Sequence, residues 1–219
     1  MIKMKTLIYG GAFDPPHFGH IHTLLEVIEN GIQFDDIWIM PYAVDAFGIK
    51  ELSSNEHRLN MLKILLDSFK GITEKFFIRT SRFDLNAGGF KSTYAMMLKL
   101  YEIYDMTEFS LIVGSDQAEQ IETWSNYKEL LKLTPLIVVP RGAPRYEKLV
   151  WALDENKKHI VLPQHDVLWK NISSTHIRQH ISSGADLKEI YNYTATLVLS
   201  YIEKNKLYRN RSLYATNKQ

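Results

Sequence analysis

The sequence contains no cysteine among its 219 residues. This absence excludes a disulfide framework, a zinc site with cysteine ligands and a thiol nucleophile. The chain also lacks a hydrophobic run near the roughly 18 residues that a membrane span needs. Its basic N-terminal segment is followed by glycines rather than by a signal-peptide cleavage site. We therefore expect a soluble, cytoplasmic protein that does not associate with membranes.

Neither sign of charge predominates, because the chain has 26 Lys and Arg residues and 25 Asp and Glu residues. Such a balance does not create the basic field that drives general nucleic-acid binding, so we expect no nucleic-acid partner. Hydrophobic residues make up 45% of the chain. A chain of this length should bury roughly 70% of its unfolded surface, which supplies a hydrophobic core without covalent cross-links.

Short β-branched runs alternate along the chain with longer segments of helical period. This alternation predicts an α/β fold, a Rossmann-like doubly wound parallel sheet covered by helices on both faces. Ser53 and Glu56 have the spacing of a capping box for one of these helices. The expected strands are 4–9, 36–40, 75–81, 109–113, 136–139 and 159–162, and the expected helices are 20–30, 56–69 and 92–104.

The last fifty residues change character and form a small C-terminal helical segment in this prediction. Its expected helices are 175–182, 186–191 and 194–204, and no Pro-, Gly- or Ser-rich linker precedes them. We predict a single domain over 1–219, with a core over 1–170 and a helical part over 171–219. In parallel sheets ligands bind beyond the carboxyl ends of the strands, so the residues that follow the strands are the ones to examine for chemistry.

The first strand leads into the segment GGAFDPPHFGH, residues 10–20. Its glycines allow a close backbone approach and its prolines stiffen the turn. His17 and His20 lie at the start of the next helix, where free N–H groups and the helix dipole favour an anion. The pattern suits a polyphosphate, whereas an ordinary turn with exposed histidines is the alternative. No metal site is expected, because His22 faces elsewhere on the helix.

A second segment, NISSTHIR at 171–178, precedes a helix of the C-terminal part. Consecutive hydroxyls at a helix start can cap the helix, and with the free N–H groups they can also hold phosphate. Arg178 follows Thr175 by three residues and therefore shares its face of the first turn. A simple cap with a solvated arginine is the alternative interpretation of this segment.

Together these segments resemble the nicotinate (nicotinamide) mononucleotide adenylyltransferases of the H-x-G-H nucleotidyltransferase superfamily. The first is similar to the family's G-G-S-F-D-P-x-H-x-G-H motif, with Ala12 in place of the usual Ser, and the second to its I-S-S-T-x-(I/V)-R motif. The resemblance implies that His17, His20 and Arg178 are catalytic. It implies that ATP is bound by Gly10, Gly11, Ala12, Phe13, Gly19, Gly114, Asp116, Ile172, Ser173, Ser174 and Thr175.

The resemblance extends to segments between the two motifs. Gly114-Ser115-Asp116 is similar to a G-(A/S)-D element whose carboxylate binds a ribose hydroxyl, although Asp116 could instead cap the next helix. Trp124 is similar to a tryptophan that bounds the pyridine pocket, and a core position is the alternative. The terminal segment 197–208 resembles the family's last helix, which we interpret as packing.

The mononucleotide is expected to contact Lys50, Thr93, Trp124 and Arg141. Two of these lie where the sequence departs from the family. Residues 44–50 read VDAFGIK rather than the P-P-H-K of the nicotinate-preferring branch, and Ser92-Thr93-Tyr94 stands for the usual Ser-Tyr-Thr. These departures leave the preference between the acid and the amide mononucleotide undetermined. Arg58 is expected to support the phosphate loop, and a surface helix arginine is the alternative.

The implied reaction is transfer of AMP from ATP to a pyridine mononucleotide, NaMN or NMN, with release of pyrophosphate and with Mg²⁺ as cofactor. The attacking 5′-phosphate is largely ionised at pH 7, so the reaction needs no general base. The alternatives are another enzyme of the superfamily, such as pantetheine-phosphate adenylyltransferase, and a non-catalytic nucleotide-binding module. The oligomeric state is left open, with a homo-oligomer compatible with the sequence.

Overall fold

The computed structural model describes residues 3–43, 52–141, 144–152, 158–164 and 172–209. Within these ranges six strands form one parallel sheet in the order β3-β2-β1-β4-β5-β6. This is the strand order of a doubly wound Rossmann-like sheet, and it confirms the predicted fold class. The strands are β1 Met4–Gly11, β2 Asp36–Pro41, β3 Ile78–Thr80, β4 Thr107–Gly114, β5 Leu136–Val139 and β6 Ile160–Val161.

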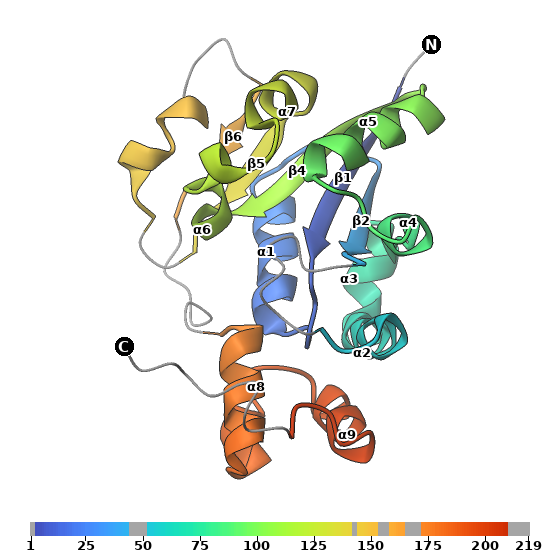
Figure 1. Ribbon diagram of the computed structural model, residues 1–219, viewed down its shortest axis with the longest axis vertical. Helices are drawn as coiled ribbons and strands as arrows, with labels where there is room; N and C mark the ends of the chain where they lie inside the picture. The colour runs from blue at the N-terminus through green and yellow to red at the C-terminus, as the bar shows by residue number, and fades with distance from the viewer. Residues whose placement is uncertain (1–2, 44–51, 142–143, 153–157, 165–171, 210–219) are drawn as a thin grey trace.

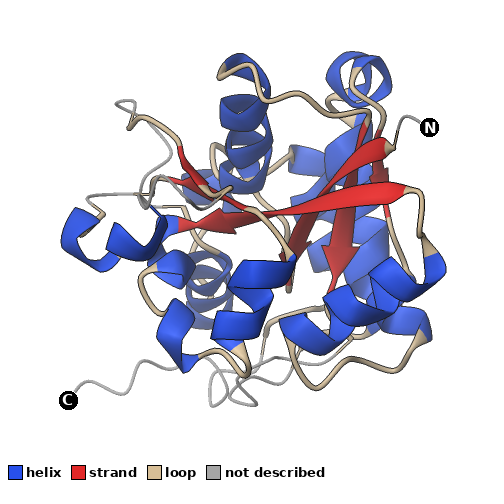
Figure 2. Ribbon diagram, turned by 90° about the horizontal axis from the view of Figure 1, so that it is seen from above, coloured by secondary structure: helices blue, strands red, loops and turns tan. Residues whose placement is uncertain are grey.

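Helices cover both faces of the sheet (Figure 2). Successive side chains of a strand point to opposite faces, so Leu7 and Ile8 of β1 enter different hydrophobic clusters. The Leu7 cluster includes side chains of α1 and α2, and the Ile8 cluster includes those of α5 and α7. These helices are α1 Phe18–Glu29, α2 Asn55–Asp67, α5 Thr93–Ile103 and α7 Tyr127–Leu133.

The C-terminal part packs against the Leu7 side of the core through α8 and α9. Ile177, Val198 and Ile202 are buried in the same cluster as α1 and α2. The arrowheads of β1 and β2 point toward the end of the molecule that holds α8 and α9 (Figure 1). This part of the chain therefore lies beyond the carboxyl ends of the strands. Its elements are α8 Ser174–Ser183, the 3-10 helix η4 Leu187–Ile190 and α9 Thr196–Lys204.

Some local predictions are wrong. The strand expected over 75–81 is only Ile78–Thr80, because the preceding residues continue as helix α3. Ser54, not Ser53, caps α2 by accepting a hydrogen bond from the amide of His57. Helix α7 was not expected from the sequence. The remaining elements are α3 Lys70–Lys75, α4 Phe83–Asn86, α6 Ser115–Ala118, η1 Ile121–Thr123, η2 Tyr146–Lys148 and η3 Val150–Ala152.

None of the helices in the described residues combines the length and the hydrophobicity needed to cross a bilayer.

Candidate active site

The loop that follows β1 places two imidazoles side by side at the start of α1. His17 is the N-cap residue, and His20 lies in the first turn of the helix. Their ring centroids are 3.8 Å apart with planes tilted by 30°. The backbone amide of His17 donates a hydrogen bond to Nδ1 of His20 at 3.0 Å. Since Nδ1 accepts this bond, the proton of the neutral His20 ring is on Nε2, which makes Nε2 a donor.

Both imidazoles are neutral in the free protein near pH 7. Burial, together with the nearby positive charge of Arg141, lowers the pKa of His20 to about 3. Burial, followed by electrostatic interactions with His20 and Arg141, also lowers the pKa of His17 well below its ordinary value. An anion at this position would offset the charge of Arg141 and favour protonation of both rings. Binding of a phosphate would therefore raise the pKa of both imidazoles.

Gly19 lets the second sequence motif approach the first. A Cβ atom at this position would lie 2.9 Å from Nδ1 of His17 and 3.6 Å from the carbonyl oxygen of Ile172. Any larger residue would push the His17 ring away. Because Ile172 is buried beside this glycine, the start of the late motif contacts the start of α1. The two segments that the sequence singled out do meet at one place.

Arg178 is buried under the loop rather than exposed to solvent. Its guanidinium donates hydrogen bonds from Nη1 to the backbone oxygen of Asp14 at 2.5 Å and from Nη2 to Oγ1 of Thr175 at 3.2 Å. Only 6% of the residue is accessible. The positive charge therefore lies directly behind the loop that carries the histidines. Of the preceding hydroxyls, Ser173 caps α8, Ser174 binds the loop and Thr175 is exposed.

Arg141 provides a cation on the open side of the site. It follows β5, its amide donates to Oγ of Ser115 at 2.9 Å, and its Nη2 donates to the backbone oxygen of Ile172 at 3.4 Å. Nη1 lies 3.9 Å from a carboxylate oxygen of Asp116, and 35% of the arginine side chain is accessible. Arg141 therefore joins the carboxyl ends of β4 and β5 to the late motif. The charge of Arg141 acts on both imidazoles, and the contact with the mononucleotide expected from the sequence stays a prediction.

Asp116 does not cap the helix that contains it. Helix α6 begins at Ser115 with Gly114 as its N-cap, and no side chain caps it. The carboxylate is half exposed and faces Arg141. A Cβ atom on Gly114 would lie 2.5 Å from Oδ1 of Asp116, so glycine is needed for this arrangement. The alternative of a capping role for Asp116 is wrong, and the carboxylate is available to a ligand.

The first four residues of the expected ATP site offer mainly their backbone to a ligand. Gly10 and Gly11 are the last residues of β1. The carbonyl of Ala12 accepts a hydrogen bond at 2.8 Å from Arg58, a fully buried arginine, so Arg58 does support the loop. Phe13 is 1% exposed and its ring lies 4.8 Å from that of His20. Any contact of Phe13 with ATP would therefore come from its backbone.

Among the described residues, those expected to contact the mononucleotide do not all form one cluster with the histidines. Thr93 is the first residue of α5, and it lines a small cavity of about 40 Å³ with Tyr42 and Asp84. Trp124 is partly buried against the Ile8 cluster, and its Nε1 has no hydrogen-bond partner among the described residues. The core alternative for Trp124 is therefore compatible with its packing. Lys50 lies outside the described residues.

Comparison with known proteins shows the family. The model of the family described as cytidylyltransferase-like matches residues 8–180, which include the loop, both imidazoles and Arg178. The chain belongs to the cytidylyltransferase-like family. It is 33% identical over 190 residues to a protein of Fusobacterium nucleatum subsp. nucleatum named probable nicotinate-nucleotide adenylyltransferase, covering 86% of this chain and 93% of that protein. This cytidylyltransferase-like protein is thus a nucleotidyltransferase of the nicotinate/nicotinamide mononucleotide adenylyltransferase family.

Two further similarities agree with this family. A protein of Methylacidiphilum infernorum with the same name is 27% identical over 221 residues, which cover 98% of this chain and 99% of that protein. A solved structure of Plasmodium falciparum nicotinic acid mononucleotide adenylyltransferase complexed with NaAD has a TM-score of 0.80. It is 24% identical and covers 94% of this chain and 97% of that one. At this identity the structural similarity shows the nucleotidyltransferase fold.

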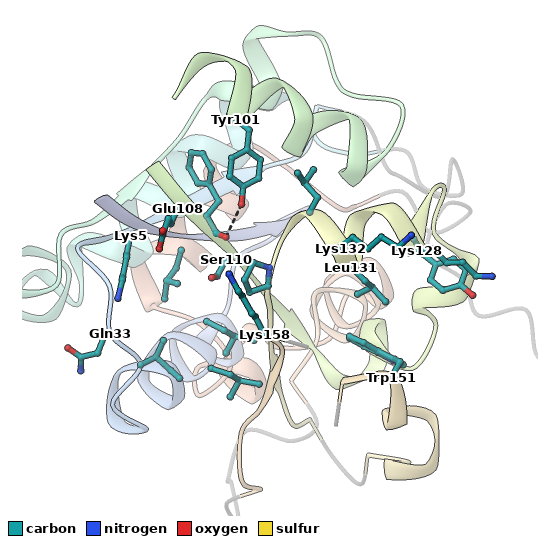
Figure 3. A pocket seen from close by; sticks show the side chains of 18 of the residues that line it. Lys5, Gln33, Tyr101, Glu108, Ser110, Lys128, Leu131, Lys132, Trp151 and Lys158 are labelled. Carbon is teal, nitrogen blue, oxygen red and sulfur yellow. Dashed lines mark hydrogen bonds between the residues drawn. The ribbon is translucent and has the colours of Figure 1, made fainter. Parts of the chain in front are cut away.

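A larger cavity of this nucleotidyltransferase lies near the amino ends of several strands (Figure 3). It has a volume of about 1030 Å³ and is lined by residues near the amino ends of strands, among them Lys5, Glu108 and Ile160. The loops with the histidines and arginines follow the carboxyl ends of β1, β4 and β5, so this cavity is not part of their site.

Proposed function

We propose that this nucleotidyltransferase transfers AMP from ATP to nicotinate mononucleotide, forming the dinucleotide deamido-NAD and releasing pyrophosphate. The observation that carries the proposal is the meeting of His17, His20 and Arg141 at the N-terminus of α1. The names of the relatives support nicotinate mononucleotide as acceptor. NMN is the second acceptor to test, because Ser92-Thr93-Tyr94 departs from the family's order beside a small cavity.

In this reaction the 5′-phosphate of the mononucleotide attacks the α-phosphorus of ATP. A new P–O bond forms as the bond to the β-phosphate oxygen breaks, and negative charge grows on the leaving pyrophosphate. The attacking phosphate is already ionised, so the protein contributes positioning and charge stabilisation rather than a base. Nε2–H of His20, the Arg141 guanidinium and the free N–H groups of α1 are the donors that would stabilise that charge.

The other expected residues have supporting roles in this proposal. His17 stacks on His20 and fixes the orientation of its ring. Arg178 adds positive charge behind the loop and holds Asp14. Asp116 would accept hydrogen bonds from ribose hydroxyls. Ser173 and Thr175 lie at the start of α8, where they would adjoin the triphosphate. Lys50, Thr93 and Trp124 remain predicted contacts of the mononucleotide.

Magnesium would enter as the complex with ATP. The described residues contain no group of three His, Asp or Glu side chains placed to hold a metal ion. Phosphate oxygens are preferred ligands of Mg²⁺, which usually keeps several waters and few protein ligands. We therefore propose that the triphosphate carries the ion and that it neutralises charge on the phosphates.

The test supplies purified protein with ATP and Mg²⁺ and, in parallel, with NaMN, NMN or 4′-phosphopantetheine. Dinucleotide and pyrophosphate are measured. We expect deamido-NAD from NaMN, and a kcat at least 100-fold lower for His20→Ala with a smaller change in KM. His180→Ala is the matched control, because His180 lies on α8 and binds the backbone of Asp186. Product only from phosphopantetheine, or ATP binding without pyrophosphate release, would refute the proposal.

A further inference from the structure

The loop that carries His17 is held by hydrogen bonds from the C-terminal part of the chain. Three successive carbonyls of the loop, those of residues 14–16, each accept a hydrogen bond from a different side chain. The donors are Arg178 to Asp14 at 2.5 Å, Ser174 to Pro15 at 2.8 Å and Thr194 to Pro16 at 2.9 Å. The amide of Phe18 in turn donates to the carbonyl of Tyr193 at 2.8 Å. Contacts from the C-terminal part thus flank His17 on both sides.

The side chain of Asp14 is bound from the same direction. Its Oδ1 accepts a hydrogen bond from the hydroxyl of Tyr208 at 2.5 Å, and its Oδ2 accepts one from the amide of Ser53 at 3.1 Å. Asp14 is 1% exposed and Tyr208 is 5% exposed. Burial, together with the negative charge of Asp14, raises the pKa of the Tyr208 phenol. The hydroxyl therefore stays protonated and remains a donor at neutral pH.

These bonds fix the position of the imidazoles. Thr194 is fully buried, so its hydroxyl and the Pro16 carbonyl have no access to water as an alternative partner. Pro15 and Pro16 restrict the backbone between the held carbonyls. His17 follows Pro16 directly, and its amide is the donor to His20. A shift of the Pro16 carbonyl would therefore be passed to His17 and through that amide to the His20 ring.

We propose that Thr194 and Tyr208 are positioning residues that set the geometry of His17 and His20 through the loop. The part of this inference that concerns kcat rests on the proposed function. Neither residue touches the reacting phosphates, and each acts through the polypeptide segment 14–17. The terminal segment 197–208, which the sequence alone assigns to packing, thereby contributes Tyr208 to what makes the site competent.

The test removes single hydroxyl groups and keeps the shape of each side chain. Thr194→Val and Tyr208→Phe are the variants, and Thr194→Ser restores the hydroxyl. Ile202→Val is the matched control, because Ile202 is buried in α9 in the same cluster as Tyr208 but its side chain has no donor for a loop carbonyl. This control substitution costs about 0.5–1.5 kcal/mol of stability. It therefore shows how much a loss of stability alone changes kcat and the ring signals.

Two measurements are made on each variant. Steady-state kinetics should show kcat lowered about 10- to 100-fold in Thr194→Val and Tyr208→Phe with KM for ATP within about threefold, and near-normal kcat in Thr194→Ser. ¹⁵N NMR of the histidine rings in the free protein should show a shift of the His20 Nδ1 signal in the same two variants. Ile202→Val should change neither quantity.

The two measurements separate the possible failures. If folded Thr194→Val and Tyr208→Phe keep wild-type ring signals and wild-type kcat, the positioning role is wrong. A loss of kcat equal to that of Ile202→Val would also overturn it. If the wild-type protein makes no product from any mononucleotide, the proposed function fails, and the ring signals of the free protein still decide whether Thr194 and Tyr208 position the histidines.

Discussion

The amide of His17 donates to the ring of His20, and this one bond determines which nitrogen of His20 can serve a phosphate. With Nδ1 occupied, Nε2 carries the proton and is the atom left to donate. The stacked His17 ring and the Phe13 ring, 4.8 Å away, limit rotation of the imidazole. The donor is thus oriented before the substrate arrives, which is the condition for stabilising charge without reorganisation.

The low pKa of His20 predicts that acid destabilises the protein. In the unfolded chain histidine titrates near 6.5, whereas in the folded protein burial and Arg141 lower the pKa of His20 to about 3. Between these values the unfolded state binds more protons, so the free energy of unfolding falls as pH decreases from about 6.5 toward 3. Urea unfolding at several pH values measures this slope. His20→Gln should flatten it, and an unchanged slope would contradict the assigned shift.

Arg141→Met should change both the titration of the histidines and the chemistry. Removing the guanidinium raises the pKa of His20 and His17, because one of the causes that lowers them is lost. It also removes a donor for the leaving group, so kcat should fall about 100-fold. NMR titration of the rings and steady-state kinetics provide the readouts.

Arg145→Met is the control for that variant. Arg145 lies four residues later and pairs with Glu119 on the surface at 2.7 Å, away from the imidazoles. The Arg145→Met substitution should leave the histidine titrations and kcat unchanged. Equal effects of the two substitutions would mean that general loss of positive charge, rather than the position of Arg141, is responsible.

Gly19→Ala should damage the site more than the fold. The new Cβ atom would lie 2.9 Å from Nδ1 of the buried His17, so that ring must move. We expect a stability loss of about 1–3 kcal/mol and a kcat reduced about 10-fold or more. Gly71→Ala is the comparison, because nothing lies within 4 Å of its Cβ position in α3. That change should be neutral or stabilising by up to about 1 kcal/mol.

The sequence predicted those parts of the structure that depend on local pattern. The run at 136–139 is entirely β-branched or leucine between two prolines, and β5 has exactly these bounds. Helix α7 was missed because it follows Asn126 in a left-handed conformation, which the sequence interpretation did not allow for. The strand over 75–81 was overextended because Phe76 and Phe77 have high strand propensity, yet they end helix α3.

In the candidate site, too, the features set by local pattern were predicted and those that depend on the fold were not. The histidines and the ISST segment were found because each has a local signature at a helix start. The partnership of Arg141 with the imidazoles depends on β5 lying beside β4, which no short pattern encodes. The bond between Tyr208 and Asp14 joins residues 194 positions apart. Tyr208 follows the amphipathic helix α9, and the sequence alone does not distinguish such a tyrosine from one that only packs.

The fastening of the loop by Thr194 and Tyr208 has a consequence for synthesis of the protein on the ribosome. A nascent chain that has been synthesised through β5 already contains both histidines and all strands of the sheet except β6. It still lacks all of the late donors, so the loop that carries the histidines has nothing to close against. Competence to bind a nucleotide should therefore be acquired late in synthesis, when the segment through Tyr208 has emerged from the exit tunnel.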